Sequence, residues 1–461
     1  MYTICRNHSQ TLFGSAIGNL RRNLKRTRGA IPWLALLVFP FYGHAEVWNL
    51  KAAIDTAVAN NPDALAALKR IEGAEASLER ASSMGKPQVY LKGSYLQTDS
   101  PMMAFGSILN QRAFDFDLNF NNPGTIDNFN TTAMVGIPLY TGGRVSSGKR
   151  AAVAGVTAAE FDEVAARHQL IAQTVRSYLN IRKAIEAVSA VEAGVKAYTS
   201  ATKNARLRYE AGQMLKADLL SLEVQLAQTK EQLVEAKHFQ TLAERNFIYV
   251  LGLPADKETV LLTENDPDIE LIVEPESLSY LARPELKALM EREKAAMEMK
   301  DVARGGRQPS VSGFASVQYD HGWQTNKSGE SWLAGVAVDL NVFDGGKTTS
   351  QIKQAEAQLA ELREYIRKAE LGIGLEVEKA RLALILARDR VSVTGLAMQQ
   401  AEESAALSRA RFEQGALLTT ELIGVESRLI EARMRRAVAL ADEVIAIAEL
   451  RRAVGFMPIQ H

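Results

Sequence analysis

The chain repeats two glycine-centred motifs at one fixed offset. The segment IPLYTGGR at 137–144 returns as LNVFDGGK at 340–347, 203 residues later. The segment RYEAG at 208–212 returns as RFEQG at 411–415, again 203 residues later. Two unrelated motifs that keep one spacing across a gapless span indicate an internal duplication. The fold must therefore be built from two similar halves.

The first 45 residues predict export. Basic residues between Arg21 and Arg28 precede an apolar run at 31–41, and Gly43 and Ala45 are small residues at the positions that a signal peptidase recognises. We expect residues 1–45 to be a signal peptide, and the two structural repeats to span 46–276 and 277–461. The apolar run is about 11 residues long, against roughly 20 for a membrane-spanning helix. No helical membrane span is expected.

Composition narrows the classes of protein that remain. The only cysteine, Cys5, lies in the expected signal peptide, so the exported chain has no thiol for a disulfide framework or a lipid anchor. The 54 basic and 54 acidic residues balance, and nothing indicates electrostatic capture of nucleic acid. We expect no nucleic-acid partner.

Proline spacing predicts very long helices. No proline occurs between Pro138 and Pro254, and these stretches are rich in residues that favour helix. A helix over 145–211 would have 67 residues and a length of roughly 100 Å. Gly212 and Gly415 are natural C-terminal caps at which the chain reverses. The second half has the same pattern, without proline between Pro309 and Pro458.

The remaining helical segments are shorter than the two long ones. Returning helices are expected at 217–251 and 420–454, each about half the outgoing length. Helices at 50–84 and 277–302 would stack end to end with them. The prediction is a pair of long antiparallel helical hairpins that form an α-barrel.

Four segments with the opposite period are predicted to be strands, at about 87–98, 131–141, 309–320 and 331–343. In the last one, Trp332, Val336 and Val338 share a face, whereas Gly335 and Asp339 lie on the other. Strands of about 10 residues that are apolar on one face, with aromatic residues near their ends, are typical of transmembrane β-barrels. The alternative is a soluble sheet with one buried face, but the export signal and the long helices favour the membrane.

Four strands cannot close a membrane barrel, because known barrels begin at about eight strands and open edges are not tolerated in lipid. The protein is therefore expected to oligomerise. The connection between the strands is 19 residues longer in the first half than in the second. These extra residues are expected around 118–124, as an exposed outer loop, because asparagine, proline and glycine crowd there.

The chain resembles the TolC-type outer-membrane efflux protein family over nearly all of its exported length. The resemblance rests on the doubled strand-then-Gly-Gly element and the doubled helical tip. It implies a homotrimer whose protomers each contribute four strands to a 12-stranded barrel in the outer membrane, above an α-helical tunnel across the periplasm. It also implies two partners, a periplasmic adaptor protein and an inner-membrane pump or ABC exporter.

The resemblance assigns roles to residues at the helical tips. It places Asp218 and Glu421 near the periplasmic mouth, where threefold symmetry would turn Glu421 into a ring of carboxylates that attracts cations. The alternative is an ordinary solvated acid stabilised by the helix macrodipole. Well-known family members have a latching tyrosine where this chain has Phe412, which lacks the hydroxyl group. The tips implied to meet the adaptor are Gly212, Gln213, Met214, Leu215, Lys216, Gly415, Ala416, Leu417, Leu418 and Thr419.

No catalytic constellation is evident, since His168 and His238 stand without partners at ligand spacing. Strand-to-helix turns are expected at Gly142, Gly143, Gly345 and Gly346. The sequence predicts a passive exit duct in the outer membrane that extends into the periplasm, opens at its helical tips and needs no cofactor or metal. The alternative is a periplasmic coiled-coil adaptor or scaffold without a pore. An enzyme is the weakest alternative, and drug efflux, metal export and protein secretion all remain open as transport roles.

Overall fold

The computed structural model describes residues 47–254, 260–264 and 266–459. They belong to one compact unit that spans 45–461. The signal peptide predicted at 1–45 lies outside the described residues. Among the helices in the described ranges, none is both long enough and apolar enough to cross a bilayer.

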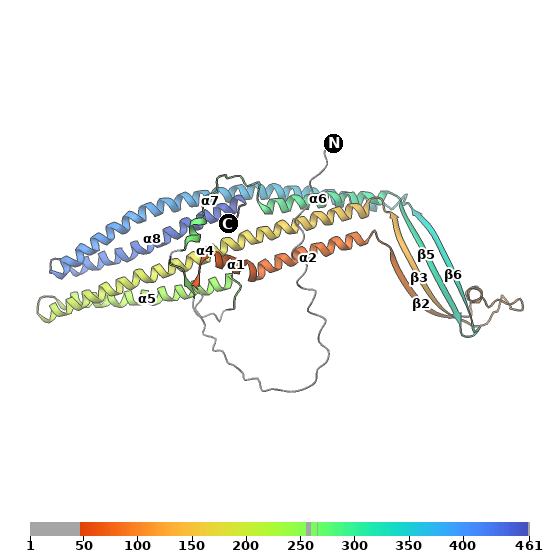
Figure 1. The fold of residues 1–461 in the computed structure, drawn as a ribbon, viewed down its shortest axis with the longest axis horizontal. Coiled ribbons are helices and arrows are strands. Elements are labelled where there is room, and N and C mark those ends of the chain that lie inside the picture. The colour runs from red at the N-terminus through yellow and green to blue at the C-terminus, as the bar shows by residue number, and fades with distance from the viewer. Residues whose placement is uncertain (1–46, 255–259, 265, 460–461) are drawn as a thin grey trace, which may run out of the picture. The chain divides into compact units, whose positions relative to one another are not determined.

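Two helices of equal length dominate the fold. Helix α4 spans Arg144–Glu210 and helix α7 spans Lys347–Glu413, each with 67 residues. At 1.5 Å per residue each is roughly 100 Å long, as expected from the sequence. Helix α5 (Lys216–Val250) returns along α4, and helix α8 (Thr419–Val454) returns along α7 (Figure 1). The predicted antiparallel hairpins are therefore confirmed.

Three shorter helices complete the helical part, α1 (Leu50–Asn60), α2 (Pro62–Ser83) and α6 (Pro284–Arg304). Helix α2 packs along α4, and α6 packs along both α4 and α7. The single helix predicted over 50–84 is wrong, because Asn61 interrupts it and caps α2 by accepting a hydrogen bond from the Asp63 N–H. The helix predicted from residue 277 begins instead at Pro284, a residue suited to a first helical turn.

The four predicted strands form one antiparallel sheet in the order β2-β3-β5-β6. Their bounds are Gln88–Thr98, Ile126–Tyr140, Ser310–Gly322 and Lys327–Asp339. Strand β3 begins five residues before the predicted start, and β6 begins four residues before it. The register shifts between Pro138 and Tyr140, where proline supplies no N–H to the ladder. Because β3 pairs with β5, the two halves share the sheet.

The strand register gives the sheet two chemically different faces. Leu91, Ala133, Val317 and Trp332 lie side by side in one row across the four strands. The next row, on the opposite face, is Lys92, Thr132, Gln318 and Ser331. The apolar face is exposed in this chain, with Val317 at 60% and Trp332 at 79% of full exposure. The predicted alternation is clear in these two rows, whereas a third row on the second face, Tyr90, Met134, Ser316 and Leu333, is mostly apolar.

The additional residues of the first half fill the whole connection between β2 and β3, residues 99–125. This connection contains a helix that the sequence did not predict, α3 at Pro101–Asn110. The corresponding connection between β5 and β6 is only the turn 323–326. The prediction of a simple loop around 118–124 was therefore too narrow.

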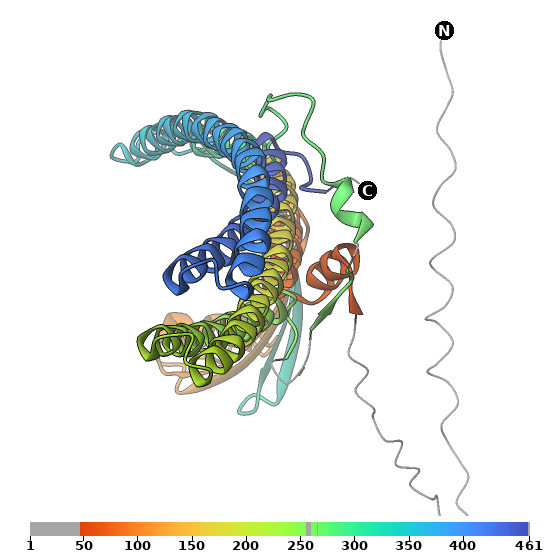
Figure 2. The same ribbon diagram turned by 90° about the vertical axis from the view of Figure 1, so that its left-hand side faces the viewer.

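A smaller group of elements lies beside the middle of the long helices. Strands β1 (Val47–Trp48) and β4 (Leu261–Leu262) pair in parallel, and the short 3-10 helix η1 spans Pro267–Leu271. They lie with α1 on the outer side of the arc that the helices trace (Figure 2). Their core is aromatic, with Trp48, Tyr178 and Phe247 fully or almost fully buried. This core joins α1, α4 and α5 at mid-length and also includes Ala441 and Ala448 of α8.

Candidate functional site

Both hairpin tips end in the same turn. Gly212 and Gly415 adopt left-handed backbone angles, with φ of 72° and 76°. The Gln213 N–H donates to the Arg208 carbonyl at 2.8 Å, and the Ala416 N–H donates to the Arg411 carbonyl at 2.8 Å. These are the hydrogen bonds of a glycine-terminated helix, which explains why the glycines repeat at one offset.

The ten tip residues expected to meet an adaptor divide into an inner and an outer set. Met214 and Leu417 pack against the apolar cluster beneath the tips, and Thr419 is buried. Leu215 and Leu418 are 71% and 67% exposed. The remaining residues, Gly212, Gln213, Lys216, Gly415 and Ala416, are exposed as well. Each tip therefore presents a leucine to solvent beside polar and small residues.

Phe412 lies inside this apolar cluster and is only 2% exposed. Its neighbours include Tyr198 of α4, Leu219 of α5 and Leu422 of α8. The side chain therefore packs the two hairpins against each other, where a tyrosine hydroxyl would require a hydrogen-bond partner. The missing hydroxyl suits this apolar environment.

Polar contacts also join the two hairpins, and sequence reasoning did not identify them. The Tyr198 hydroxyl donates to the Ile423 carbonyl at 2.9 Å and lies 3.0 Å from the Ser427 Oγ. Nearer the tips, the Arg208 Nη1 donates to the Phe412 carbonyl at 3.2 Å. Burial raises the pKa of Tyr198, which keeps its proton available as a donor. Tyr198 was missed because its counterpart 203 residues later is an alanine, so no repeated motif marks it.

Helices α4 and α8 approach each other closely at Gly194, one helical turn before Tyr198 and farther from the tips. A Cβ atom added to Gly194 would lie 2.3 Å from the Ile430 Cδ1 atom of α8. Ile430 could relieve this overlap only by shifting within the packed cluster. Gly194 and Tyr198 together define the seam along which the two hairpins of one chain meet.

An ion pair recurs in both hairpins at the duplication offset. Arg206 pairs with Glu223 across the first hairpin, and Arg409 pairs with Glu426 across the second. The Glu426 side chain is 3% exposed, whereas that of Glu223 is 35% exposed. The hydrogen bond to Glu426 raises the pKa of Arg409. The Arg409–Glu426 pair is therefore more shielded from solvent than the Arg206–Glu223 pair.

The two candidate gate acids occupy equivalent first turns. Asp218 lies in the first turn of α5 and is half-buried, and Glu421 lies in the first turn of α8 and is exposed. A carboxylate in the first turn of a helix is stabilised by the macrodipole. This local role is available to each residue without any partner chain.

The four strand-to-helix glycines lie where the strands end and the long helices begin. Gly142, Gly143, Gly345 and Gly346 all have positive φ, between 65° and 89°. A Cβ atom on Gly142 would lie 2.6 Å from the Gly305 carbonyl oxygen. The turn in the first half therefore requires glycine for both its backbone angle and its close packing.

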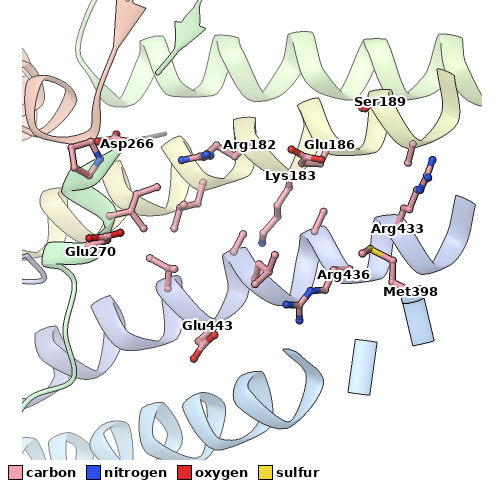
Figure 3. Close-up of a pocket in the computed structure, with 18 of the residues that line it drawn as sticks. Arg182, Lys183, Glu186, Ser189, Asp266, Glu270, Met398, Arg433, Arg436 and Glu443 are labelled. Atoms are coloured by element: carbon pink, nitrogen blue, oxygen red, sulfur yellow. The ribbon is translucent and has the colours of Figure 1, made fainter. Parts of the chain in front are cut away.

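A cavity of about 960 Å³ lies between α4 and α8, bounded by η1 and by two residues of α7. Lys183 reaches from α4 toward α8 (Figure 3) and pairs with Asp442 at 2.6 Å. Arg433 pairs with Glu402 of α7 at 2.9 Å. The lining contains residues of both charge signs, and no group of three or more potential metal ligands occurs in the described part of the chain. The cavity is a groove between helices with a lining of mixed polar and apolar side chains.

The comparison with known families gives a match over both halves. The profile of the outer membrane efflux protein family matches residues 53–253 and 277–456. The chain belongs to this family. Membership confirms the predicted family, the efflux function and the outer-membrane localisation. Members of the family are channel proteins.

Two named relatives extend this result. The chain is 23% identical to the outer membrane efflux protein BepC of Brucella suis over 345 residues, which cover 71% of this chain and 73% of BepC. It is 22% identical to the outer membrane protein TolC of Vibrio cholerae over 315 residues, covering 66% and 71% of the two chains.

Solved structures show the same fold at low identity. The Campylobacter jejuni CmeC outer membrane channel superimposes with a TM-score of 0.75 at 17% identity, over 95% of each chain. The Vibrio cholerae outer membrane protein VceC gives 0.74 at 18% identity, over 88% of this chain and 96% of VceC. The mostly helical fold with a small sheet is thus an outer-membrane channel fold.

Proposed function

We propose that this protein is the outer-membrane channel of a tripartite efflux or type I secretion system, and that it acts as a passive homotrimeric duct. The observation that carries the proposal is the four-stranded sheet, which has one apolar exposed face and two unpaired edges, β2 and β6. An open sheet edge is not tolerated in lipid. Three sheets joined edge to edge make a closed 12-stranded barrel with every strand paired.

The helices support the same assembly. Contacts along the chain place the long helices in the order α5, α4, α8 and α7, so α5 and α7 are the outer pair. Both carry exposed apolar residues: Val224, Val234, Leu242 and Tyr249 on α5, and Leu371, Leu375, Leu382, Leu386 and Val393 on α7. Packing α5 of one protomer against α7 of the next would cover both rows and close a ring. The result is an α-barrel continuous with the strands.

The hairpin seam suggests how the helical end stays closed. Tyr198 and Arg208 hold the α7/α8 hairpin against the α4/α5 hairpin through carbonyl groups of the second hairpin. Separation of the hairpins would break both contacts. In a trimer, Asp218 and Glu421 would each occur three times near this mouth, where the carboxylates would attract cations.

Single-channel conductance tests this function. The wild-type protein should form channels in planar bilayers, and Tyr198→Phe combined with Arg208→Ala should raise the conductance, because two contacts between the hairpins are lost. Tyr209→Phe is the matched control, since Tyr209 lies on the same helix but is 39% exposed. A protein that forms no channel would refute the duct and favour a periplasmic scaffold.

Adaptor binding is proposed at the exposed tips, where Leu215 and Leu418 supply apolar contacts. Changing both to aspartate should abolish export in cells and leave conductance in bilayers unchanged. Export that survives the double change would place the partner contact elsewhere. An inner-membrane pump or ABC exporter would supply the energy.

A further inference from the structure

The connection between β2 and β3 is a folded element at the ends of these strands that are remote from the helices (Figure 1). It spans 99–125 and includes α3, whereas the second half makes the same connection with 323–326. We call residues 99–125 the insert. The second half joins its two strands without such a segment, so the insert is not needed to form the sheet.

Two glycines show which face of the sheet the insert covers. A Cβ atom on Gly322 would lie 2.2 Å from the Gln111 Oε1, and one on Gly329 would lie 2.0 Å from the Asn110 carbonyl oxygen. By strand alternation, both positions point to the same face as Asp320. That face is the polar one, opposite Val317 and Trp332. The end of α3 therefore lies against the polar face.

Hydrogen bonds fasten the insert in this position. The fully buried Gln111 donates from Nε2 to the Asn128 Oδ1 at 2.9 Å and to the Asp127 carbonyl at 2.7 Å. Its Oε1 accepts from the Thr325 hydroxyl at 2.7 Å. Arg112 donates from Nη2 to the Glu330 carbonyl at 3.1 Å. Strands β3 and β6 and the β5–β6 turn are thus all bound to one short segment.

The polar face is covered at this end of the sheet. Asp320 is only 1% exposed, and its carboxylate accepts hydrogen bonds from Asn128 at 2.7 Å, Asn130 at 2.9 Å and Gln318 at 2.6 Å. A buried carboxylate requires such partners. This network ties the strand ends together on the face that the insert covers.

The rest of the insert has an apolar core of its own. Phe105 lies 5.0 Å from Phe120 between ring centroids, and Phe114 lies 5.8 Å from Phe120. The Phe116 ring contacts the edge of this core, with its centroid 5.2 Å from that of Phe114, yet Phe116 is 90% exposed and Met102 is 88% exposed. The insert is therefore a small packed unit that presents large apolar side chains on its surface.

We infer that the insert is a constriction at the outer exit of the channel and that it sets the size limit for exported substrates. The inference rests on the proposed duct. If the apolar face of the sheet meets lipid, the polar face lines the lumen, and the insert lies inside the barrel. Threefold symmetry places three inserts around one exit. Substrates would leave past apolar side chains that include Phe116.

The second half supplies the replacement for the test. Residues 99–125 are exchanged for the Trp-Gln-Thr-Asn turn of 323–326, and single-channel conductance is recorded in planar bilayers. Removal of three constrictions should raise the conductance at least about twofold and admit larger solutes. Unchanged conductance would place the insert outside the permeation path and overturn the inference.

A smaller change tests the same inference without altering the fold. Phe116→Cys should conduct as the wild type does until a bulky thiol reagent is added, which should then reduce the current. Val336→Cys is the control, because Val336 is 65% exposed on the apolar face and its modification should leave the current unchanged. A reagent without effect at position 116 would refute the constriction. A wild-type protein without channels would instead refute the duct.

Discussion

The two halves of the chain solve one structural problem with different side chains. At mid-length a short helix meets the end of a returning helix, α2 with α5 in the first half and α6 with α8 in the second. In both, the short helix begins with proline, and the returning helix is followed by a glycine with positive φ, Gly252 or Gly455. We call these places the first and second junctions.

One hydrogen bond is equivalent in the two junctions. Asn61 donates from Nδ2 to the Val250 carbonyl at 2.8 Å, and Arg283 donates from Nη1 to the Ala453 carbonyl at 3.0 Å. The two carbonyls are 203 residues apart, the offset of the tip motifs. The two halves therefore share the backbone acceptor, whereas the donor is a neutral amide in the first junction and a cation in the second.

The second junction contains further charged groups. Arg283 also pairs with Glu376 of α7 at 2.7 Å, and Arg452 pairs with the same carboxylate. The first junction instead contains a cavity of about 380 Å³ lined by Asn61, Gln173 and Arg176 among others. At the junctions the two halves therefore share backbone geometry, whereas the side chains around it differ in charge.

The largest effect is expected from Gly455→Ala. An added Cβ would lie 2.7 Å from the Arg283 backbone nitrogen, at a position with φ of 92°. Left-handed strain and overlap with backbone together should lower the free energy of unfolding by about 4 kcal/mol. Chemical denaturation in detergent measures this.

The control for this change is Gly212→Ala, at φ of 72° with open space around the missing Cβ. It carries only the left-handed strain and should cost about 1 kcal/mol. Equal losses at the two positions would show that the close approach at the second junction does not matter.

A smaller effect should separate the two donors. Arg283→Met removes a side chain that is 6% exposed and leaves the Ala453 carbonyl without this donor, so we expect a loss of about 3 kcal/mol. Asn61→Ala removes a neutral donor and a helix cap, and should cost about 1 kcal/mol. Thermal unfolding of both variants measures which of the two loses more stability. A larger loss for Asn61→Ala would show that the cationic donor does not contribute more stability than the neutral one.

The smallest effect concerns pH and should arise at the second junction. Burial would raise the pKa of Glu376, but Arg452 and Arg283 outweigh it and hold the pKa below its usual range. Glu376 therefore stabilises the fold above pH about 4.3, and this contribution is lost as pH falls through the lower folded-state pKa. Glu376→Gln should lose less stability than the wild type between neutral pH and pH about 3.5, as thermal melts would show. An identical loss in both proteins would exclude this role.

The sequence predicted the parts of the fold that backbone chemistry dictates. Proline-free stretches located α4 and α7, and the tip glycines located both reversals, because helices need continuous N–H donors and glycine tolerates positive φ. The break at Asn61 could have been predicted from its own pattern, since asparagine before proline favours a helix start. Helix α3 was missed because its ten residues are too few to show a helical repeat of apolar positions.

Contacts between distant segments could not be predicted in the same way. Tyr198 acts through a carbonyl of α8, and Arg283 acts through Glu376, 93 residues away. Neither contact follows a local spacing rule, because each depends on how two helices are rotated against one another. The duplication offset was the only long-range signal that we found in the sequence. It predicts nothing at positions where the two halves have different residues.

In the proposed assembly, three chains close one barrel. The most direct test is the mass of the protein extracted in mild detergent, with the detergent contribution subtracted. We predict three times the mass of the exported chain. A mass equal to one chain, from protein that is soluble without detergent, would contradict the shared barrel and favour a scaffold.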